Sequence, residues 1–217
     1  MDLNNSRALV LDFGGVVTRT LFETHDLTEQ ALGLEPGALT WRGPFEPSSD
    51  PLWQSMQADR ISERDYWRTR TREVAKLVGR DWDKMSDFVK AARGADPLPI
   101  IRPQAIDAIE RVRKANGKLA ILSNELDLFY GEDFRTKLPF MDRFSVIIDA
   151  TYTRILKPDP RAYLSCSEAL GIDNEHCVFV DDQMRNIVGA REVGMQTVHF
   201  DVQQPEQCYR QALNLLQ

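Results

Sequence analysis

The stretch LVLDFGGVV, residues 9–17, has the composition of a short buried β-strand that ends in a carboxylate. Its apolar residues occupy successive positions, which is typical of a strand covered on both faces. Asp12 follows the strand directly, and Gly14 and Gly15 come next. Alone, Asp12 is consistent with a catalytic group, a metal ligand or a residue that caps a turn. Its role therefore depends on what the rest of the chain places beside it.

Four further apolar runs have the same character. With the first, the predicted strands are ALVLD (8–12), KLAILSN (118–124), FSVIID (144–149), CVFVDD (177–182) and MQTVHFD (195–201). Apolar residues recur at helical spacing between them, at 104–116, 160–170 and 184–193. Strands that alternate with helices indicate βαβ units, and right-handed crossovers then give a doubly wound sheet. The sequence predicts an α/β fold with a three-layer core around a parallel sheet.

Residues 18–97 interrupt this alternation, because they contain no convincing strand. Their helical stretches lie near 21–33, 50–59, 62–78 and 81–93, separated by Gly and Pro signals. We expect a helical cap domain at 18–97, inserted after the first strand, and a core made of 1–17 and 98–217. Five basic residues within 64–76 are expected to form a solvated helix face.

Polar residues follow several of the predicted strands, at the point where each strand ends. Asp12 and the pair Asp181 and Asp182 come directly after apolar runs, and so do Ser123 and Asn124. The carboxyl ends of parallel strands meet at one edge of a sheet, where ligands bind. Two adjacent ionised carboxylates are costly without a cation, which favours a metal over a structural turn.

Four motifs resemble, in order and spacing, those of the haloacid dehalogenase-like hydrolase superfamily. They are LVLDFGGVV with Asp12, LAILSN with Ser123 and Asn124, LKPDPRAY with Lys157, and VFVDDQMRN with Asp181, Asp182 and Asn186. Each motif alone is weak, but the combination is specific. The resemblance spans nearly the whole chain. It implies a Rossmann-like core, and the insert looks like the first cap class of that family.

The resemblance implies a Mg²⁺-dependent phosphatase that acts on a small phosphate monoester. Asp12 would attack phosphorus and form an aspartyl-phosphate. The metal ligands would be Asp12, Asp182 and the backbone carbonyl of Gly14, with Asp181 as an auxiliary ligand. Oxygen ligands of this kind are those that Mg²⁺ prefers. Asn186 would orient the aspartate pair or the surroundings of the metal.

Three residues are assigned to phosphate by the same resemblance. Lys157 would pair with the nucleophile and the phosphoryl oxygens, and Ser123 and Asn124 would bind phosphate. Taken alone, Ser123 and Asn124 are also typical of a helix cap, and Lys157 of a solvated loop. The coincidence of nucleophile, metal and phosphate groups favours the catalytic interpretation.

Gly14 departs from the pattern of most phosphatases in this family, which carry a second Asp at that position as general acid and base. The first interpretation is a phosphatase whose acid comes from elsewhere, with Glu125 and Asp127 as weak candidates. The second is a 2-haloacid dehalogenase, whose halide needs no proton. Asp181 and Asp182 would repel its carboxylate substrate. The third is a module that binds Mg²⁺ and phosphoryl groups with little turnover.

The overall charge excludes one class of partner. Thirty-three acidic residues outnumber 27 basic ones, giving a net charge of −6, which is not the clustered basic footprint of a nucleic-acid-binding protein. Apolar runs are too short for a signal sequence or a membrane span, so no membrane association is expected. The three cysteines, expected to be free thiols, fit a reducing cytoplasm. We expect a cytoplasmic monomer or homodimer.

Overall fold

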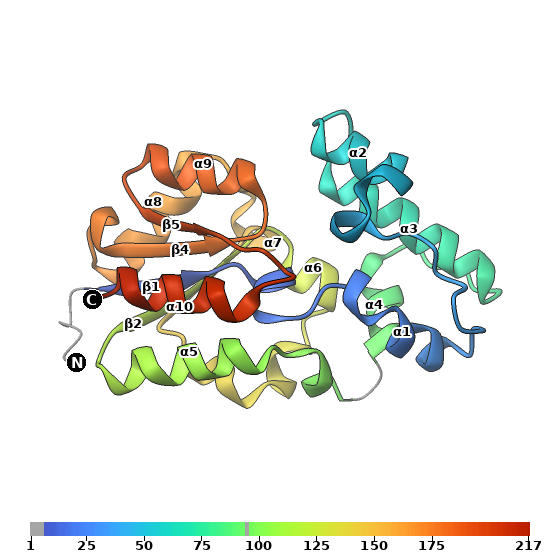
Figure 1. Ribbon diagram of the computed structural model, residues 1–217, viewed down its shortest axis with the longest axis horizontal. Coiled ribbons are helices and arrows are strands. Elements are labelled where there is room, and N and C mark those ends of the chain that lie inside the picture. Colours follow the sequence, from blue (N-terminus) through green and yellow to red (C-terminus); the bar gives the residue numbers. More distant parts are fainter. Residues whose placement is uncertain (1–6, 94–95) are drawn as a thin grey trace. The chain divides into compact units, whose positions relative to one another are not determined.

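The computed structural model describes residues 7–93 and 96–217 (Figure 1). It contains a five-stranded sheet in the order β3-β2-β1-β4-β5, in which every neighbouring pair is parallel. The strands are β1 Ala8–Leu11, β2 Lys118–Ser123, β3 Val146–Asp149, β4 Cys177–Asp181 and β5 Gln196–His199. The α/β prediction is confirmed, with each strand near its predicted place.

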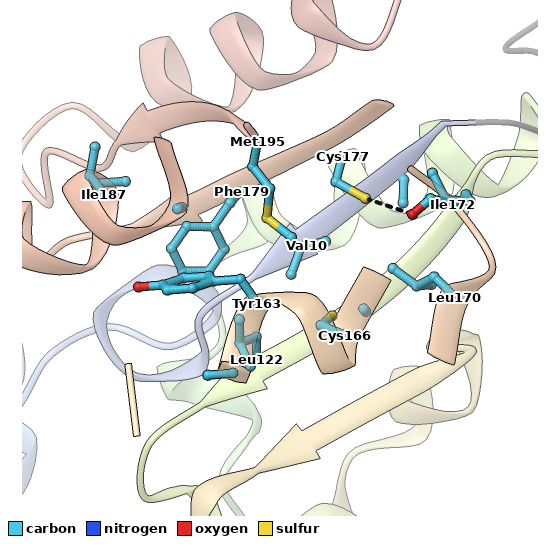
Figure 2. Close-up of a cluster of buried hydrophobic side chains, with 14 residues drawn as sticks. Val10, Leu122, Tyr163, Cys166, Leu170, Ile172, Cys177, Phe179, Ile187 and Met195 are labelled. Carbon is cyan, nitrogen blue, oxygen red and sulfur yellow. Dashed lines mark hydrogen bonds between the residues drawn. The ribbon is translucent and has the colours of Figure 1, made fainter. Parts of the chain in front are cut away.

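Helices cover both faces of the sheet. The pair α5 (Pro103–Lys114) and α10 (Pro205–Leu215) packs together on one face, and α8 (Pro160–Leu170) and α9 (Met184–Glu192) pack together on the other. Between the second pair and the sheet, Tyr163 meets Phe179 edge-on, with ring centroids 5.5 Å apart, inside a buried apolar cluster (Figure 2). The short helices α6 (Leu126–Tyr130) and α7 (Ala150–Thr153) follow β2 and β3.

The register of the strands brings their carboxyl ends to one edge. Ser123 at the end of β2 pairs with Asp149 at the end of β3. The end of β1 is held beside β4, because the Asp12 N–H donates to the carbonyl of Val180 over 2.9 Å. Asp12 therefore leaves the central strand next to Asp181, the last residue of β4. This arrangement positions the candidate site.

Two compact units make up the chain. The first consists of Met1–Arg19, Ile101–Leu126 and Arg135–Gln217, and the second of Thr20–Ile100 with Asp127–Phe134. The second unit contains α1 His25–Leu32, α2 Pro51–Gln57, α3 Glu63–Leu77 and α4 Met85–Arg93. Short 3₁₀ turns complete the two units, at Phe22–Thr24, Gly43–Phe45, Pro47–Ser49, Leu98–Ile100, Arg135–Lys137, Pro139–Arg143 and Asn174–His176.

The segment Asp127–Phe134 belongs with the helical unit, although the sequence analysis assigned it to the core. Its contacts explain the difference. Phe129 packs edge-on against Trp67 with ring centroids 5.4 Å apart, and Asp133 forms an ion pair with Lys90 at 2.9 Å. Contacts between segments so distant in the chain leave no local pattern in the sequence.

A buried carboxylate, Asp50, joins helices α2 and α3 of the helical unit. It caps α2 by accepting the Trp53 N–H at 2.9 Å, and it accepts the Tyr66 hydroxyl at 3.0 Å and Arg70 at 2.6 Å. The guanidinium of Arg70 also lies over the Trp41 and Tyr66 rings. The predicted solvated helix face is therefore wrong for Arg70, which is buried because Asp50 neutralises it.

All three cysteines are free thiols and buried, as expected. None of the helices in residues 7–93 and 96–217 combines the length and the apolar character needed to cross a bilayer.

His25 is an unusual member of the helical unit. It is 8% exposed, and neither ring nitrogen has a hydrogen-bond partner among the described residues. Its ring lies edge-on to Trp41, with centroids 4.3 Å apart. Burial lowers the pKa of His25 to about 4, and the positive charge of Arg42 acts in the same direction. The neutral ring is therefore the form that the fold accommodates.

We expect His25 to make the protein less stable in acid. The unfolded chain binds a proton at His25 below about pH 6.5, whereas the folded chain does so only near pH 4. The free energy of unfolding should therefore fall between these values, by about 2 kcal/mol from pH 7.5 to pH 5. Urea denaturation of the wild type and of His25→Phe at both pH values measures this loss. The wild type should lose about 2 kcal/mol more than His25→Phe does. His176→Gln, in a half-buried histidine elsewhere, is the control. An equal acid loss in His25→Phe would contradict the prediction.

Candidate active site

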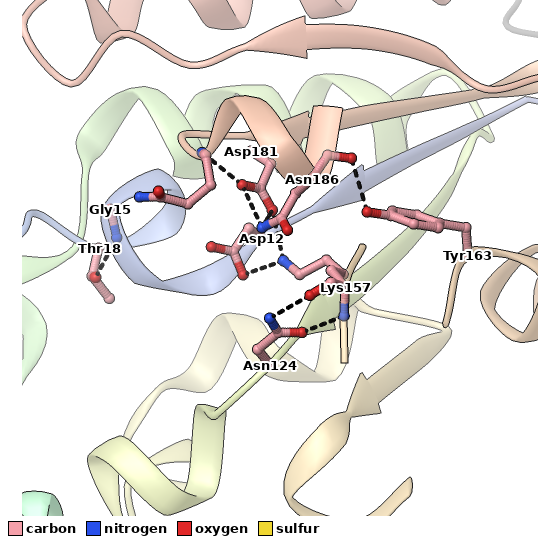
Figure 3. Close-up of polar contacts among 9 residues, drawn as sticks. Asp12, Gly15, Thr18, Asn124, Lys157, Tyr163, Asp181 and Asn186 are labelled. Atoms are coloured by element: carbon pink, nitrogen blue, oxygen red, sulfur yellow. Dashed lines mark hydrogen bonds and ion pairs between the residues drawn. The ribbon is translucent and has the colours of Figure 1, made fainter. Parts of the chain in front are cut away.

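The centre of the site is a buried lysine between two aspartates (Figure 3). Lys157 Nζ lies 2.9 Å from Asp12 Oδ1 and 2.6 Å from Asp181 Oδ2. The side chains of Lys157 and Asp181 are 1% and 0% exposed, and that of Asp12 is 14% exposed. Burial alone would lower the pKa of Lys157, but the two carboxylates outweigh it and raise the pKa above its ordinary value. The ammonium is thus held in its charged form.

Asn124 fixes the backbone of Lys157. Its Oδ1 accepts the Lys157 N–H at 2.7 Å, and its Nδ2 donates to the Lys157 carbonyl at 3.1 Å. Asn124 directly follows β2, so this pair of bonds joins that strand to the loop that carries the lysine (Figure 3). The amide expected to bind phosphate is therefore engaged in positioning Lys157.

Three groups donate hydrogen bonds to the buried carboxylate of Asp181. Asn186 Nδ2 lies 3.0 Å from each of its oxygens, and the Gln183 N–H donates to Oδ1 at 2.8 Å. The third is Lys157. Asn186 on α9 is fixed in turn, because its carbonyl accepts the Tyr163 hydroxyl at 2.8 Å. Asn186 therefore holds the carboxylate of Asp181 in place.

Helix α9 approaches this loop unusually closely at Gly189. A Cβ atom there would lie 2.8 Å from the carbonyl oxygen of Pro158, which follows Lys157. Only glycine allows that distance without a shift of backbone. The residue type at 189 thus sets how near Asn186 comes to the lysine loop.

Three carboxylates gather at the edge of the sheet. One oxygen each of Asp12, Asp181 and Asp182 can be chosen so that all lie within 4.8 Å of one another. Burial raises the pKa of Asp12 to about 7; Lys157 opposes this and the charge of Asp181 adds to it. Ionised carboxylates this close together repel one another, and a cation among them would relieve that repulsion.

The donor set fits Mg²⁺. Every ligand on offer is a hard oxygen, and none is sulfur or imidazole. Asn186 Oδ1 is also buried with no hydrogen-bond partner within the described part of the chain. An unsatisfied buried acceptor beside this cluster suits a hydrated cation, whose water ligands donate hydrogen bonds.

The turn Phe13–Val17 begins directly after Asp12. It is closed by the Thr18 N–H, which donates to the Phe13 carbonyl at 3.1 Å. Gly15 has φ 79°, a left-handed conformation that favours glycine, whereas Gly14 has φ −69° and ψ 128°, which any residue adopts. The backbone therefore does not demand glycine at 14, where most phosphatases of the resembled family carry an acid.

The remaining candidates lie at different places. Ser123 is buried at the end of β2, and its hydroxyl makes no hydrogen bond to another residue of 7–93 or 96–217. Glu125 is half-buried in the first unit, whereas Asp127 is buried in the second unit. Asp12, Asn124, Lys157, Asp181, Asp182 and Asn186 are brought together.

Comparison with known proteins shows the family of the chain. The family model for haloacid dehalogenase-like hydrolases matches residues 6–194, so the chain belongs to this family and is a hydrolase. It is 32% identical to a phosphatase from Mycobacterium tuberculosis over 99 residues. These aligned residues make up 46% of each protein. The chain thus spans less than half the length of that relative.

Two solved structures share the fold. An L-2-haloacid dehalogenase from Xanthobacter autotrophicus is 23% identical, with a TM-score of 0.57, covering 88% of this chain and 76% of that one. An enzyme of the same family from Bacteroides thetaiotaomicron, solved with magnesium and inorganic phosphate, is 18% identical, with a TM-score of 0.53, covering 90% and 94%.

We expect Lys157→Met to destabilise the protein strongly. Removing the ammonium leaves Asp12 and Asp181 side by side, buried and unpaired, which typically costs about 3–5 kcal/mol. Urea denaturation at pH 7.5 without divalent metal measures the loss. Lys114→Met, at an exposed position on α5, is the matched control and should stay within about 0.5 kcal/mol of the wild type. A loss below about 1 kcal/mol in Lys157→Met would show that the ammonium does not hold the two carboxylates.

Proposed function

We propose that this hydrolase is a Mg²⁺-dependent phosphatase that acts on small phosphate monoesters through an aspartyl-phosphate on Asp12. The observation that carries the proposal is the cluster in which Asp12, Asp181 and Asp182 converge beside the buried Lys157. Phosphoryl transfer needs a nucleophile, neutralising charge and positioning, and this cluster contains groups suited to each. The phosphatase relative and the magnesium-bound structural relative support the same interpretation.

Each residue has a part in this proposal. Asp12 is the nucleophile, and Lys157 donates to it and to the phosphoryl oxygens. Asp12, Asp182 and the Gly14 carbonyl hold the metal, with Asp181 as an auxiliary ligand. When bound, Mg²⁺ supplies positive charge that offsets the repulsion between carboxylate and phosphate.

Phosphate contact is also part of the proposal. Ser123 supplies a hydroxyl near the phosphoryl group. Asn124 contributes through the backbone of Lys157, which it holds, and Asn186 through Asp181. The substrate is a small phosphorylated molecule.

The reaction has two balanced steps. An Asp12 carboxylate oxygen attacks phosphorus, the bond from phosphorus to the ester oxygen breaks, and the alkoxide leaves with the electron pair. Water then attacks the phosphorus of the aspartyl-phosphate and loses a proton to the solvent. The bond from phosphorus to Asp12 breaks, which returns the carboxylate and releases inorganic phosphate. The alkoxide takes its proton from water or from the substrate, since glycine at position 14 has none to give.

A second candidate is 2-haloacid dehalogenation, favoured by Gly14 together with the dehalogenase relative. Asp12 would then attack carbon and expel halide, which needs no proton. The cluster of carboxylates argues against it, because the substrate is itself a carboxylate and would be repelled. Halide release from a 2-haloacid without Mg²⁺ is the reaction that distinguishes it.

We expect Mg²⁺-dependent hydrolysis of para-nitrophenyl phosphate, whose good leaving group needs little acid help. Asp12→Asn should lower kcat/KM by more than about a thousandfold, because the amide is a poor nucleophile. Asp201→Asn is the matched control: it follows β5 and binds the Gln203 N–H. It should retain activity.

Two results would count against the phosphatase. Activity of Asp12→Asn within a few-fold of the wild type would exclude the covalent step. Absence of phosphate release with Mg²⁺, together with halide release from a 2-haloacid, would replace phosphatase with dehalogenase.

We expect Gly14→Asp to change the dependence of rate on the leaving group. A restored general acid protonates poor leaving groups, and such help is worth about 10²–10⁴-fold. The ratio of kcat/KM for an alkyl phosphate to that for para-nitrophenyl phosphate should rise at least about tenfold. Gly14→Asn, of the same size without the acid, should leave the ratio unchanged. An equal rise in both variants would mean that shape, not acidity, is responsible.

A further inference from the structure

Arg102 is a buried cation that grips the turn after the nucleophile. It is 3% exposed, and its Nε and Nη2 donate to the Gly15 carbonyl at 3.1 and 3.0 Å. Its own N–H donates to the Val17 carbonyl at 3.0 Å, and its guanidinium lies over the Phe200 ring at 5.4 Å. Arg102 directly precedes α5, so these contacts attach the turn after Asp12 to the start of a core helix.

Two further side chains hold the same turn. The Tyr209 hydroxyl, from α10, donates to the Val16 carbonyl at 3.0 Å. The Gly15 N–H donates to Thr18 Oγ1 at 3.4 Å. The carbonyls of Gly15, Val16 and Val17 therefore each accept a hydrogen bond from outside the turn. Arg102 provides the donors for two of these three carbonyls.

The turn needs such contacts because of its glycines. Gly14 and Gly15 have no side chains to pack, and glycine loses more conformational freedom on folding than any other residue. The Gly14 carbonyl and the Gly15 N–H belong to the same peptide group, and in a trans peptide they point in opposite directions. The hydrogen bond from the Gly15 N–H to Thr18 therefore also sets the direction of the Gly14 carbonyl. The Arg102 contact at the next carbonyl restrains Gly15, which has φ 79°.

The burial of Arg102 is itself informative. Burying a guanidinium costs several kcal/mol unless it is well bonded, and hydrogen bonds from charged donors are stronger than neutral ones. The positive charge of Arg102 strengthens its hydrogen bonds to the Gly15 carbonyl. A neutral donor would satisfy the same carbonyl with less rigidity.

We propose that Arg102 is a positioning residue that, with Tyr209 and Thr18, holds the Phe13–Val17 turn so that the Gly14 carbonyl can ligate Mg²⁺ beside Asp12. The inference rests on the proposed function, because it assigns a use to the metal. In this chain the Arg102 contact takes over the rigidity that a side chain at position 14 would otherwise lend to the turn.

The test compares Arg102→Gln and Arg102→Lys with Arg113→Gln. Arg113 is an exposed arginine on α5, the helix that Arg102 precedes, and it pairs with Glu110. Isothermal titration with MgCl₂ gives the Kd for Mg²⁺, and hydrogen–deuterium exchange of the metal-free protein reports on residues 13–18. Arg102→Gln should weaken Mg²⁺ binding at least tenfold and speed exchange in this segment alone. Arg102→Lys, which keeps the charge, should restore part of both. In turnover, kcat should fall with little change in KM.

Failure of the two proposals is distinguishable. If the wild type neither binds Mg²⁺ nor shows Mg²⁺-dependent turnover, the proposed function and the metal role of Arg102 both fall, even if exchange in 13–18 changes. If the wild type binds Mg²⁺ and Arg102→Gln binds it equally well, only the present inference is overturned. If Arg102→Gln does not fold, Tyr209→Phe decides: faster exchange near Val16 with Mg²⁺ binding about threefold weaker supports the inference, and no change in either overturns it.

Discussion

The contact of the Lys157 ammonium with Asp12 and Asp181 is the interaction on which the site depends. It joins the loop between α7 and α8 to the end of β1, 145 residues away in the chain, and to the end of β4, 24 residues away. A buried ammonium between two buried carboxylates is stable only if all three are fully bonded. Asn124, which fixes the lysine backbone, and Asn186, which fixes Asp181, exist in this structure as a consequence of that demand.

The site therefore combines tight bonding with three carboxylates held close together. Lys157, Asn186 and the Gln183 N–H all donate to Asp181, and one oxygen each of Asp12, Asp181 and Asp182 lies within 4.8 Å of the others. Groups arranged to bind a cation or an anionic substrate commonly cost stability in their absence, and enzymes accept that cost at functional sites. The rigid partners of Lys157 and the anchored turn after Asp12 hold these carboxylates in place.

Much of this arrangement was predictable because it follows from local patterns. Successive apolar residues marked the strands, and the shared direction of parallel strands placed Asp12 beside Asp181. Arg102 was not predictable, since an arginine before Pro103 looks like an ordinary helix start and its target, the Gly15 carbonyl, is 87 residues away. The burial of Arg70 was missed because its partner, Asp50, lies 20 residues earlier outside any helical repeat. The exchange of Asp127–Phe134 into the helical unit likewise depends on distant contacts.

The order of strands has a consequence for synthesis of the chain. β1 is the central strand, yet its neighbours β2 and β4 begin only at Lys118 and Cys177. On the ribosome, at about 5–20 residues per second, the apolar strand that carries the nucleophile waits on the order of ten seconds for its first partner. During that time helices α1 to α4 can form while both edges of β1 lack their ladder hydrogen bonds. Exposed strand edges invite pairing with other chains, so the long insertion makes the nascent chain dependent on protection of β1 until β2 is made.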